Sequence, residues 1–111
     1  TALEYLDCSD CSLTTLDLSV NTSLQTLWCG SNSLNTLDVS LNTNLTVFYC
    51  QNSGLNTLVL GSSINLNNIT GLLLTGNTNL TIHVGTSQRV SDFQTIFVAG
   101  THYDVGTNIV I

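Results

Sequence analysis

A block of 21 residues repeats along most of the chain, and this period limits the possible folds more than any other feature. Four repeating positions hold cysteine or an apolar residue in each block: Leu6, Leu27 and Phe48; Cys8, Cys29 and Cys50; Leu13, Leu34 and Leu55; Leu16, Leu37 and Leu58. A fixed period of this length is typical of solenoids, because one block cannot bury its own leucines whereas stacked blocks can.

Each block divides into halves of ten and eleven residues, as in LWCGSNSLNT (27–36) followed by LDVSLNTNLTV (37–47). Each half opens with two apolar residues separated by one variable residue, and closes with a stretch of Asn, Ser and Thr. The alternation indicates a strand and the polar stretch indicates a turn. We therefore expect two short strands and two turns in each coil, with the strands of successive coils stacked in parallel about 4.8 Å apart.

The motif L-x-C-x-x-N-x-L-x-x-L-D-V-S-x-N-x-x-L of residues 27–45 resembles the short leucine-rich repeats of secreted bacterial proteins of the Bacteroidota (flavobacterial) type. The resemblance implies a leucine-rich-repeat solenoid over residues 1–82, closed by a small α/β C-terminal cap over 83–111. It also implies an extracellular or cell-surface location. The segment TALEY (1–5) aligns with TSLQT (22–26), so the chain starts within a repeat and we expect solenoid residues before it.

The repeat becomes irregular toward its C-terminal end. Residues 69–82 resume it with part of a coil missing, because LLLTGNTNLTI (72–82) aligns with LDVSLNTNLTV (37–47). An irregular last coil is expected near the end of a solenoid.

The cap contains one helix signal. Ser91 and Gln94 have the spacing of a capping box, and Phe93, Ile96 and Phe97 fall on one helical face. We expect a helix at 91–98 that ends at Ala99-Gly100, followed by short strands at 102–105 and 108–111. Together these elements should cover the C-terminal end of the leucine core.

The cysteine column replaces inward aliphatic residues such as Leu18 and Val39. We therefore expect Cys8, Cys29 and Cys50 to be buried free thiols that act as small hydrophobic side chains. A bridge between Cys8 and Cys29 on adjacent strands is the alternative, with a geometry that is uncommon.

A second special column holds Cys11, Asn32 and Ser53, each two residues before a repeat leucine. A side chain at this position can turn inward and bond the backbone of the neighbouring coil. We expect this arrangement because buried backbone groups in a turn need such partners.

The charge composition excludes several classes of partner. The chain has no Lys, a single arginine, Arg89, and a formal net charge of −6. Nucleic acid and anionic membranes are poor partners, because nothing would neutralise their phosphates. No apolar run is long enough to cross a bilayer, so we expect no membrane insertion.

Outward positions carry a group of aromatic side chains. Trp28 and Tyr49 share an outward column, and Tyr5 and Val47 fill the adjacent one. These four residues should lie on one sheet face in neighbouring coils. Aromatic side chains exposed together suit either a protein-binding hot spot or a platform for a glycan.

The N-terminal end of the solenoid has no cap within this sequence. The side chains expected at this end are Leu6, Cys8, Leu16 and Leu18. They should face solvent unless upstream residues or another molecule cover them. If a second copy covers them, a head-to-tail contact that does not close would give a filament.

Two further columns have a functional and a structural interpretation. Asp17 and Asp38 stack on the second strand, where they suit a calcium site, a glycosidase pair, or carboxylates that bond the turn backbone; the repeat favours the last. The threonine column Thr15, Thr36 and Thr57 suits either ice binding or an ordinary strand.

Taken together, these patterns predict a non-catalytic module with no cofactor and no metal. We expect an extracellular or cell-surface protein-interaction or adhesion module that binds a protein or a glycan. A structural subunit of an extracellular filament, built from copies of this chain, is the alternative, and an ice-binding solenoid is the third.

Overall fold

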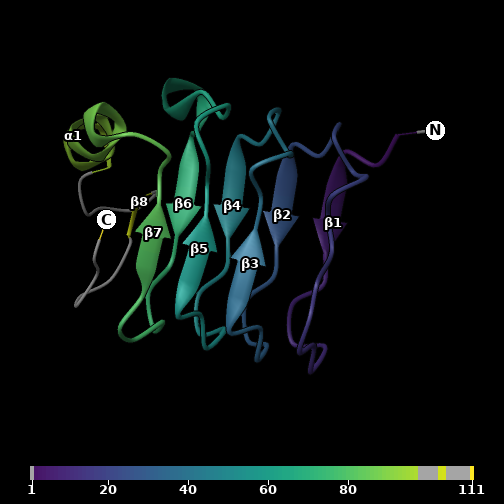
Figure 1. Ribbon diagram of the computed structural model, residues 1–111. Helices are drawn as coiled ribbons and strands as arrows, with labels where there is room; N and C mark the ends of the chain where they lie inside the picture. The colour runs from purple at the N-terminus through teal and green to yellow at the C-terminus, as the bar shows by residue number, and fades with distance from the viewer. Residues whose placement is uncertain (1, 98–102, 105–110) are drawn as a thin grey trace.

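The computed structural model, which describes residues 2–97, 103–104 and 111, is a β-solenoid of stacked parallel strands with one C-terminal helix (Figure 1). The first sheet contains, in spatial order, β1 (Tyr5–Asp7), β2 (Thr26–Trp28), β4 (Val47–Tyr49), β6 (Gly71–Leu73) and β8 (Tyr103–Asp104). The second contains β3 (Thr36–Asp38), β5 (Thr57–Val59) and β7 (Thr81–His83). Every pairing in both sheets is parallel, as the repeat predicts.

The strand register confirms the 21-residue period for the first coils. Leu6 pairs with Leu27 and Leu27 with Phe48, which are steps of 21 residues. Phe48 then pairs with Leu72, a step of 24 residues. The third coil is therefore longer, with a 3-10 helix at Leu66–Asn68 in the added part.

The expected alignment of residues 72–82 with 37–47 is wrong. Leu72 lies in the first sheet beside Phe48, whereas Leu37 lies in the second sheet. The two halves of a coil share the same apolar pattern. The three extra residues before Leu72 therefore made residues 72–82 align with the second half of a coil, although they form the first half. Nothing is missing from this coil.

The first coil departs from the prediction of two strands per coil. Residues 15–17 form no strand, so β3 has a partner on only one side within the described residues. A cleft of about 290 Å³ lies between this segment and the β3 edge, lined by Leu16, Leu18, Leu34 and Leu41 among others. The pairing that would stack Asp17 on Asp38 does not form.

Apolar side chains from both sheets fill the space between them. The inward columns at Leu27, Leu37 and Leu58 are buried, as expected from the alternation. Burial continues into the cap, where Phe93 and Phe97 pack with ring centroids 4.6 Å apart. The core is therefore continuous from the second coil to the helix.

The helix α1 spans Ser87–Ile96, so the predicted bounds 91–98 are wrong at both ends. Thr86 is the N-cap, and its side chain accepts a hydrogen bond from the Arg89 amide. The helix thus ends before the expected stop at Ala99-Gly100, and most of the expected strand at 108–111 lies outside the described residues. The part of the chain that the structure describes contains no helix able to cross a membrane.

Two of the cysteines form a disulfide, which corrects the prediction of free thiols. Cys29 and Cys50 are joined across adjacent strands, with Cα atoms 4.7 Å apart, within the range that a disulfide spans. Both residues are fully buried in the core. Cys8 and Cys11 are free, and burial raises the pKa of the Cys8 thiol.

An aromatic ladder as candidate functional site

Three aromatic side chains form a ladder on the outer face of the first sheet. The register places Asp7, Trp28 and Tyr49 in one column, and Tyr5, Thr26 and Val47 in the next. Trp28 stacks on Tyr49 with centroids 5.9 Å apart and planes at 21°, and Tyr5 meets Trp28 edge-on at 5.8 Å. The predicted aromatic group is therefore assembled, with its members in direct contact.

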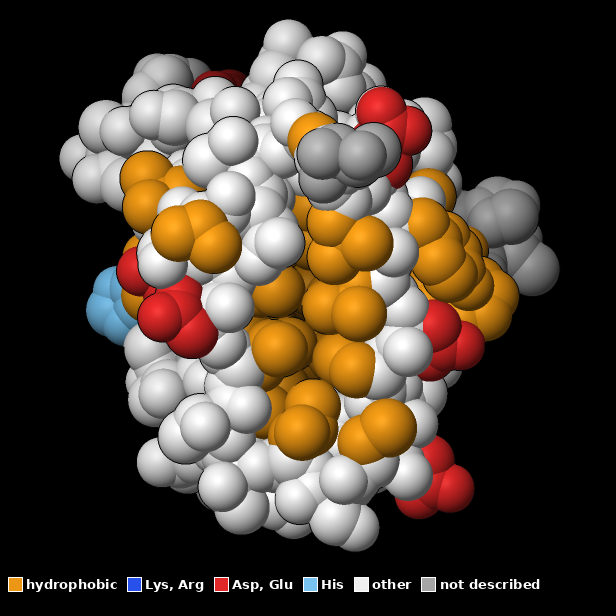
Figure 2. Space-filling view, turned by 90° about the vertical axis from the view of Figure 1, so that its right-hand side faces the viewer, with side chains coloured by type: hydrophobic (Ala, Val, Ile, Leu, Met, Phe, Trp, Pro, Cys, Tyr) orange, Lys and Arg blue, Asp and Glu red, His pale blue; other side chains and the backbone are white. Residues whose placement is uncertain are grey.

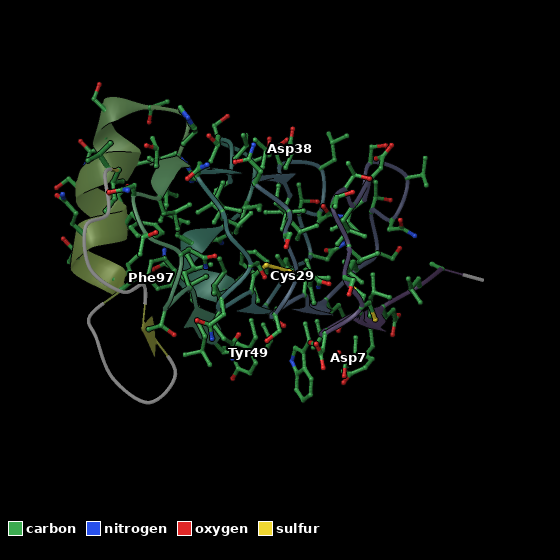
Figure 3. The ribbon with its side chains drawn as sticks, turned by 90° about the horizontal axis from the view of Figure 1, so that it is seen from below. Asp7, Cys29, Asp38, Tyr49 and Phe97 are labelled. Carbon is green, nitrogen blue, oxygen red and sulfur yellow. A yellow bond between two sulfur atoms is a disulfide. The ribbon has the colours of Figure 1, made fainter. Side chains whose placement is uncertain are left out.

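The ladder is partly open to solvent. Tyr5 is 52% exposed and Trp28 is 36% exposed, whereas Val47 and Tyr49 are half-buried. Figure 3 shows Asp7 and Tyr49 projecting from the same side of the solenoid, Asp38 on the opposite side, and Cys29 in the interior. Exposure decreases from Tyr5 toward Tyr49, so the N-terminal part of the ladder is the most accessible.

Gly71 lies beneath Tyr49, the last aromatic residue of the ladder. A Cβ atom at this position would lie 2.9 Å from the Tyr49 hydroxyl oxygen and 3.0 Å from Cε1 of its ring. The ring of Tyr49 therefore lies directly over the Gly71 backbone in the neighbouring strand. Nothing in the sequence pattern marked Gly71, because this residue occupies an outward column where any strand residue would fit.

A shallow cleft of about 360 Å³ adjoins the ladder. Trp28 and Tyr49 form part of its wall, and the rest comes from residues in or just after the strands, namely Ser9, Gly30, Ser31, Gln51 and Leu73. The lining combines aromatic surface with amide and hydroxyl groups. Such a surface can hold an apolar group and hydrogen-bond its polar neighbours.

The N-terminal end of the solenoid is apolar at its centre (Figure 2). Leu6, Cys8 and Leu16 of the predicted assembly end are partly buried there. Leu18 is an exception, since it is 2% exposed and belongs to the core. Acidic side chains lie around the rim of this end in the same view.

The outward aspartates act as turn residues. Asp7, Asp17 and Asp38 each accept a hydrogen bond through Oδ1 from the backbone N–H two residues later, at 2.8 to 3.0 Å. The bonds from Ser19 lower the pKa of Asp17 below its ordinary value. Within the described residues, no three His, Cys, Asp or Glu side chains gather as metal ligands.

The expected inward hydrogen-bonding column is present, but it includes Asn77 and does not include Cys11. Asn32 and Ser53 bond the backbone of the preceding coil, and Asn77 continues the column in the fourth coil. The Cys11 side chain is exposed and bonds only within its own coil, through Ser9, whereas its backbone N–H donates to Asn32 of the next coil. Asn42 forms a similar inward contact in the other turn, to Leu18 and Asn21.

The threonine column of the second sheet contains Thr36, Thr57 and Thr81, without the predicted Thr15. The neighbouring outward column holds Asp38, Val59 and His83. The face therefore presents a single row of hydroxyl and methyl groups, beside residues of mixed size and charge.

Comparisons of this chain with family models, curated proteins and solved structures find no match.

Proposed function

We propose that the chain is a non-catalytic protein-interaction or adhesion module of the extracellular space or cell surface. The observation that carries this proposal is the ladder of Tyr5, Trp28 and Tyr49 on three adjacent strands. A stacked, partly exposed aromatic group on a rigid sheet loses little conformational entropy on binding. Such groups are common centres of protein interfaces.

The ring orientation favours a protein partner over a glycan. A glycan platform needs aromatic faces that are open to solvent. In the ladder, Trp28 and Tyr49 turn their faces toward each other, and Tyr5 contacts Trp28 edge-on. The accessible parts are therefore mainly ring edges and polar tips, which suit interdigitation with side chains of another protein.

Two observations support the proposed location. The repeat motif resembles that of secreted bacterial leucine-rich-repeat proteins, and we assign the chain to that type as part of the proposal. The Cys29–Cys50 disulfide is weak additional support, because disulfides persist mainly in oxidising compartments.

The proposal is tested by selecting a displayed random-peptide library on the immobilised chain, with each selected clone then measured against two variants. Trp28→Ala should abolish the binding of most clones. Leu41→Ala, at a residue that is 55% exposed and outside the ladder, should leave it unchanged. Clones that bind Trp28→Ala as well as the original chain would show that the ladder is not the interaction site.

A filament subunit remains the second candidate function, supported by the apolar N-terminal end. In that case a second copy would cover Leu6, Cys8 and Leu16. The assembly prediction in the Discussion separates the two functions.

A further inference from the structure

We infer that the chain has a second binding site, a polar cleft between successive coils that takes a neutral glycan. This site is separate from the aromatic ladder, and the inference does not rest on the proposed function. Three features carry it: an added turn that forms one wall, a lining of amide and hydroxyl side chains, and backbone hydrogen bonds that hold these side chains in place.

The cleft has a volume of about 410 Å³, within the range of small-molecule sites, about 300 to 1,000 Å³. Its described lining residues are all Asn, Gln or Thr, and they come from three successive coils. The residues used below are Gln25 from the turn before β2, Asn44 and Thr46 from the turn before β4, and Asn67, Asn68 and Thr70 from the turn before β6. The cleft therefore depends on the stacking of coils within the solenoid.

The added turn of the third coil forms one wall of the cleft. Leu66 and Ile69 are buried, whereas Asn67 and Asn68 between them are exposed. Asn65 Oδ1 accepts from the Asn67 N–H at 3.0 Å and fixes the turn. Figure 1 shows this turn beside the one that leads into β4. Insertions in solenoid repeats often form the binding face, and a preformed wall loses little entropy when a ligand binds.

Three of the lining residues form a row in register across the coils. Gln25 O accepts from the Thr46 N–H at 2.8 Å, and Thr46 O accepts from the Thr70 N–H at 2.7 Å. The hydroxyl groups of Thr46 and Thr70 donate to the same two carbonyls, at 3.2 and 3.3 Å. Because each hydroxyl proton is used within the chain, the two hydroxyl oxygens offer acceptors to a ligand. The amide of Gln25 can both donate and accept.

The lining selects the chemistry of the ligand. Among the described residues that line the cleft, none is charged, so an ionic group would lose hydration without gaining a partner. None is aliphatic or aromatic either, so the apolar side chains of a peptide would gain little contact there. The best match is a neutral ligand with closely spaced groups that donate and accept hydrogen bonds. Sugar hydroxyls do both, and so do the amides of Asn67 and Asn68.

The test titrates the ¹⁵N-labelled chain with three neutral trisaccharides, built from glucose, mannose or N-acetylglucosamine. Nuclear magnetic resonance follows the backbone and side-chain amide signals. At least one of the three sugars should shift the signals of Gln25, Asn67 and Thr70 and reach saturation. Trigalacturonic acid, which adds carboxylates to similar rings, should not shift them, because the cleft offers no charged partner.

Two variants remove cleft amides and keep the backbone contacts. Asn67→Ala retains the N–H that donates to Asn65, and Gln25→Ala retains the carbonyl that accepts from Thr46. Each should weaken the binding of the neutral sugar about fivefold, the effect of losing one hydrogen-bonding group. Gln88→Ala, at an exposed residue of α1 outside the cleft, is the matched control and should change nothing.

Three results would each overturn the inference. They are the absence of saturable shifts with all three neutral sugars, larger shifts at the Trp28 indole than at the cleft, and equal affinity of the original chain and both cleft variants. None of these results affects the proposed function, because the dependence of library clones on Trp28 decides that question separately.

Discussion

At the scale of single residues, the inward asparagines hold successive coils together. Asn32 Oδ1 accepts from the backbone N–H groups of Cys11 and Leu13 at 3.1 and 2.9 Å. Its Nδ2 donates to the Cys8 and Cys29 carbonyls. One buried amide thus forms hydrogen bonds with backbone groups of two coils. Buried turns need such partners, because water cannot reach their backbone groups.

Replacing Asn32 by Ala should lower the free energy of unfolding by about 3 kcal/mol, because several backbone groups lose their partner at once. Urea denaturation measures the change. Asn44 also bonds the preceding coil, through Thr22, but in an exposed turn. Asn44→Ala should therefore cost less than about 1 kcal/mol. Similar losses in the two variants would show that the inward column has no special role.

Gly71 gives a second prediction at this scale. Gly71→Ala should displace the Tyr49 ring, since the added methyl group would lie 2.9 Å from its hydroxyl oxygen. The Trp28 fluorescence and the near-ultraviolet circular dichroism should change, and we expect a loss of about 1 kcal/mol as the stacked pair is disturbed. Thr70→Ala, at the exposed adjacent residue, is the control. An unchanged spectrum in Gly71→Ala would mean that Tyr49 does not rest on this glycine.

Asp17 predicts a weak dependence of stability on pH. Its folded-state pKa is below the ordinary value of 3.8, because its carboxylate accepts from Ser19. Its contribution to stability is therefore present above the unfolded pKa and is lost as the pH falls through the folded pKa. The difference in melting temperature between the original chain and Asp17→Asn should shrink below pH 4. A difference that grows on acidification would contradict this assignment.

At the scale of secondary-structure elements, Arg89 attaches the helix to the solenoid. Its Nε donates to Val84 O at 2.6 Å, and its Nη2 donates to Gly61 O and Ile64 O at 2.9 Å each. A planar guanidinium can reach three carbonyls from one direction, whereas the ammonium of lysine is a compact point charge. The only Lys or Arg residue of the chain thus has a structural role.

Arg89→Lys should retain the charge but lose part of this contact. We expect the free energy of unfolding to fall by about 2 kcal/mol, and the amides of α1 to exchange faster in hydrogen-exchange mass spectrometry. Gln88→Ala, one residue earlier and exposed, should leave α1 protection nearly unchanged. Protection of α1 that is unaffected by Arg89→Lys would show that the apolar contacts of the helix are sufficient to hold it.

The elements also show which parts of the fold can be read from the sequence. Strict alternation identified the inward faces, since a period of two leaves a side chain only two directions. The helix start was harder to predict. Thr86 lacks a Glu or Gln three residues later, whereas Ser91 is followed by Gln94, so the capping-box signal favoured the wrong residue.

For the candidate site, too, alternation predicts which face the side chains share but not which contacts they make. Alternation placed Tyr5, Trp28 and Tyr49 on one face, but it carries no information on ring orientation or on the contact with Gly71. The Cys29–Cys50 bond also escaped prediction, because a column of three cysteines fits either burial or pairing. Those details depend on side-chain packing between coils.

At the scale of the whole molecule, the two ends of the solenoid differ in their surface chemistry. Its N-terminal end has an apolar centre with an acidic rim, and its C-terminal end carries the helix and the single arginine (Figures 1 and 2). The apolar centre promotes association of copies, whereas the rim opposes it. Which effect dominates depends on the ionisation of the carboxylates.

We therefore expect the chain to be monomeric at pH 7 and low salt, and to associate through its N-terminal end in acid, where the net negative charge is reduced. Light scattering after size exclusion measures the mass at each pH. Leu6→Lys places a charge that persists in acid at the centre of this end, and should prevent the association. Val20→Lys adds the same charge at a residue that is 85% exposed, and should not.

The outcome at neutral pH decides between the two candidate functions. Ordered fibres in negative-stain electron microscopy at pH 7, growing with concentration and prevented by Leu6→Lys, would establish the filament subunit. Monodisperse particles at pH 7 that associate only in acid would show that the rim keeps copies apart. The aromatic ladder then remains accessible to a partner protein.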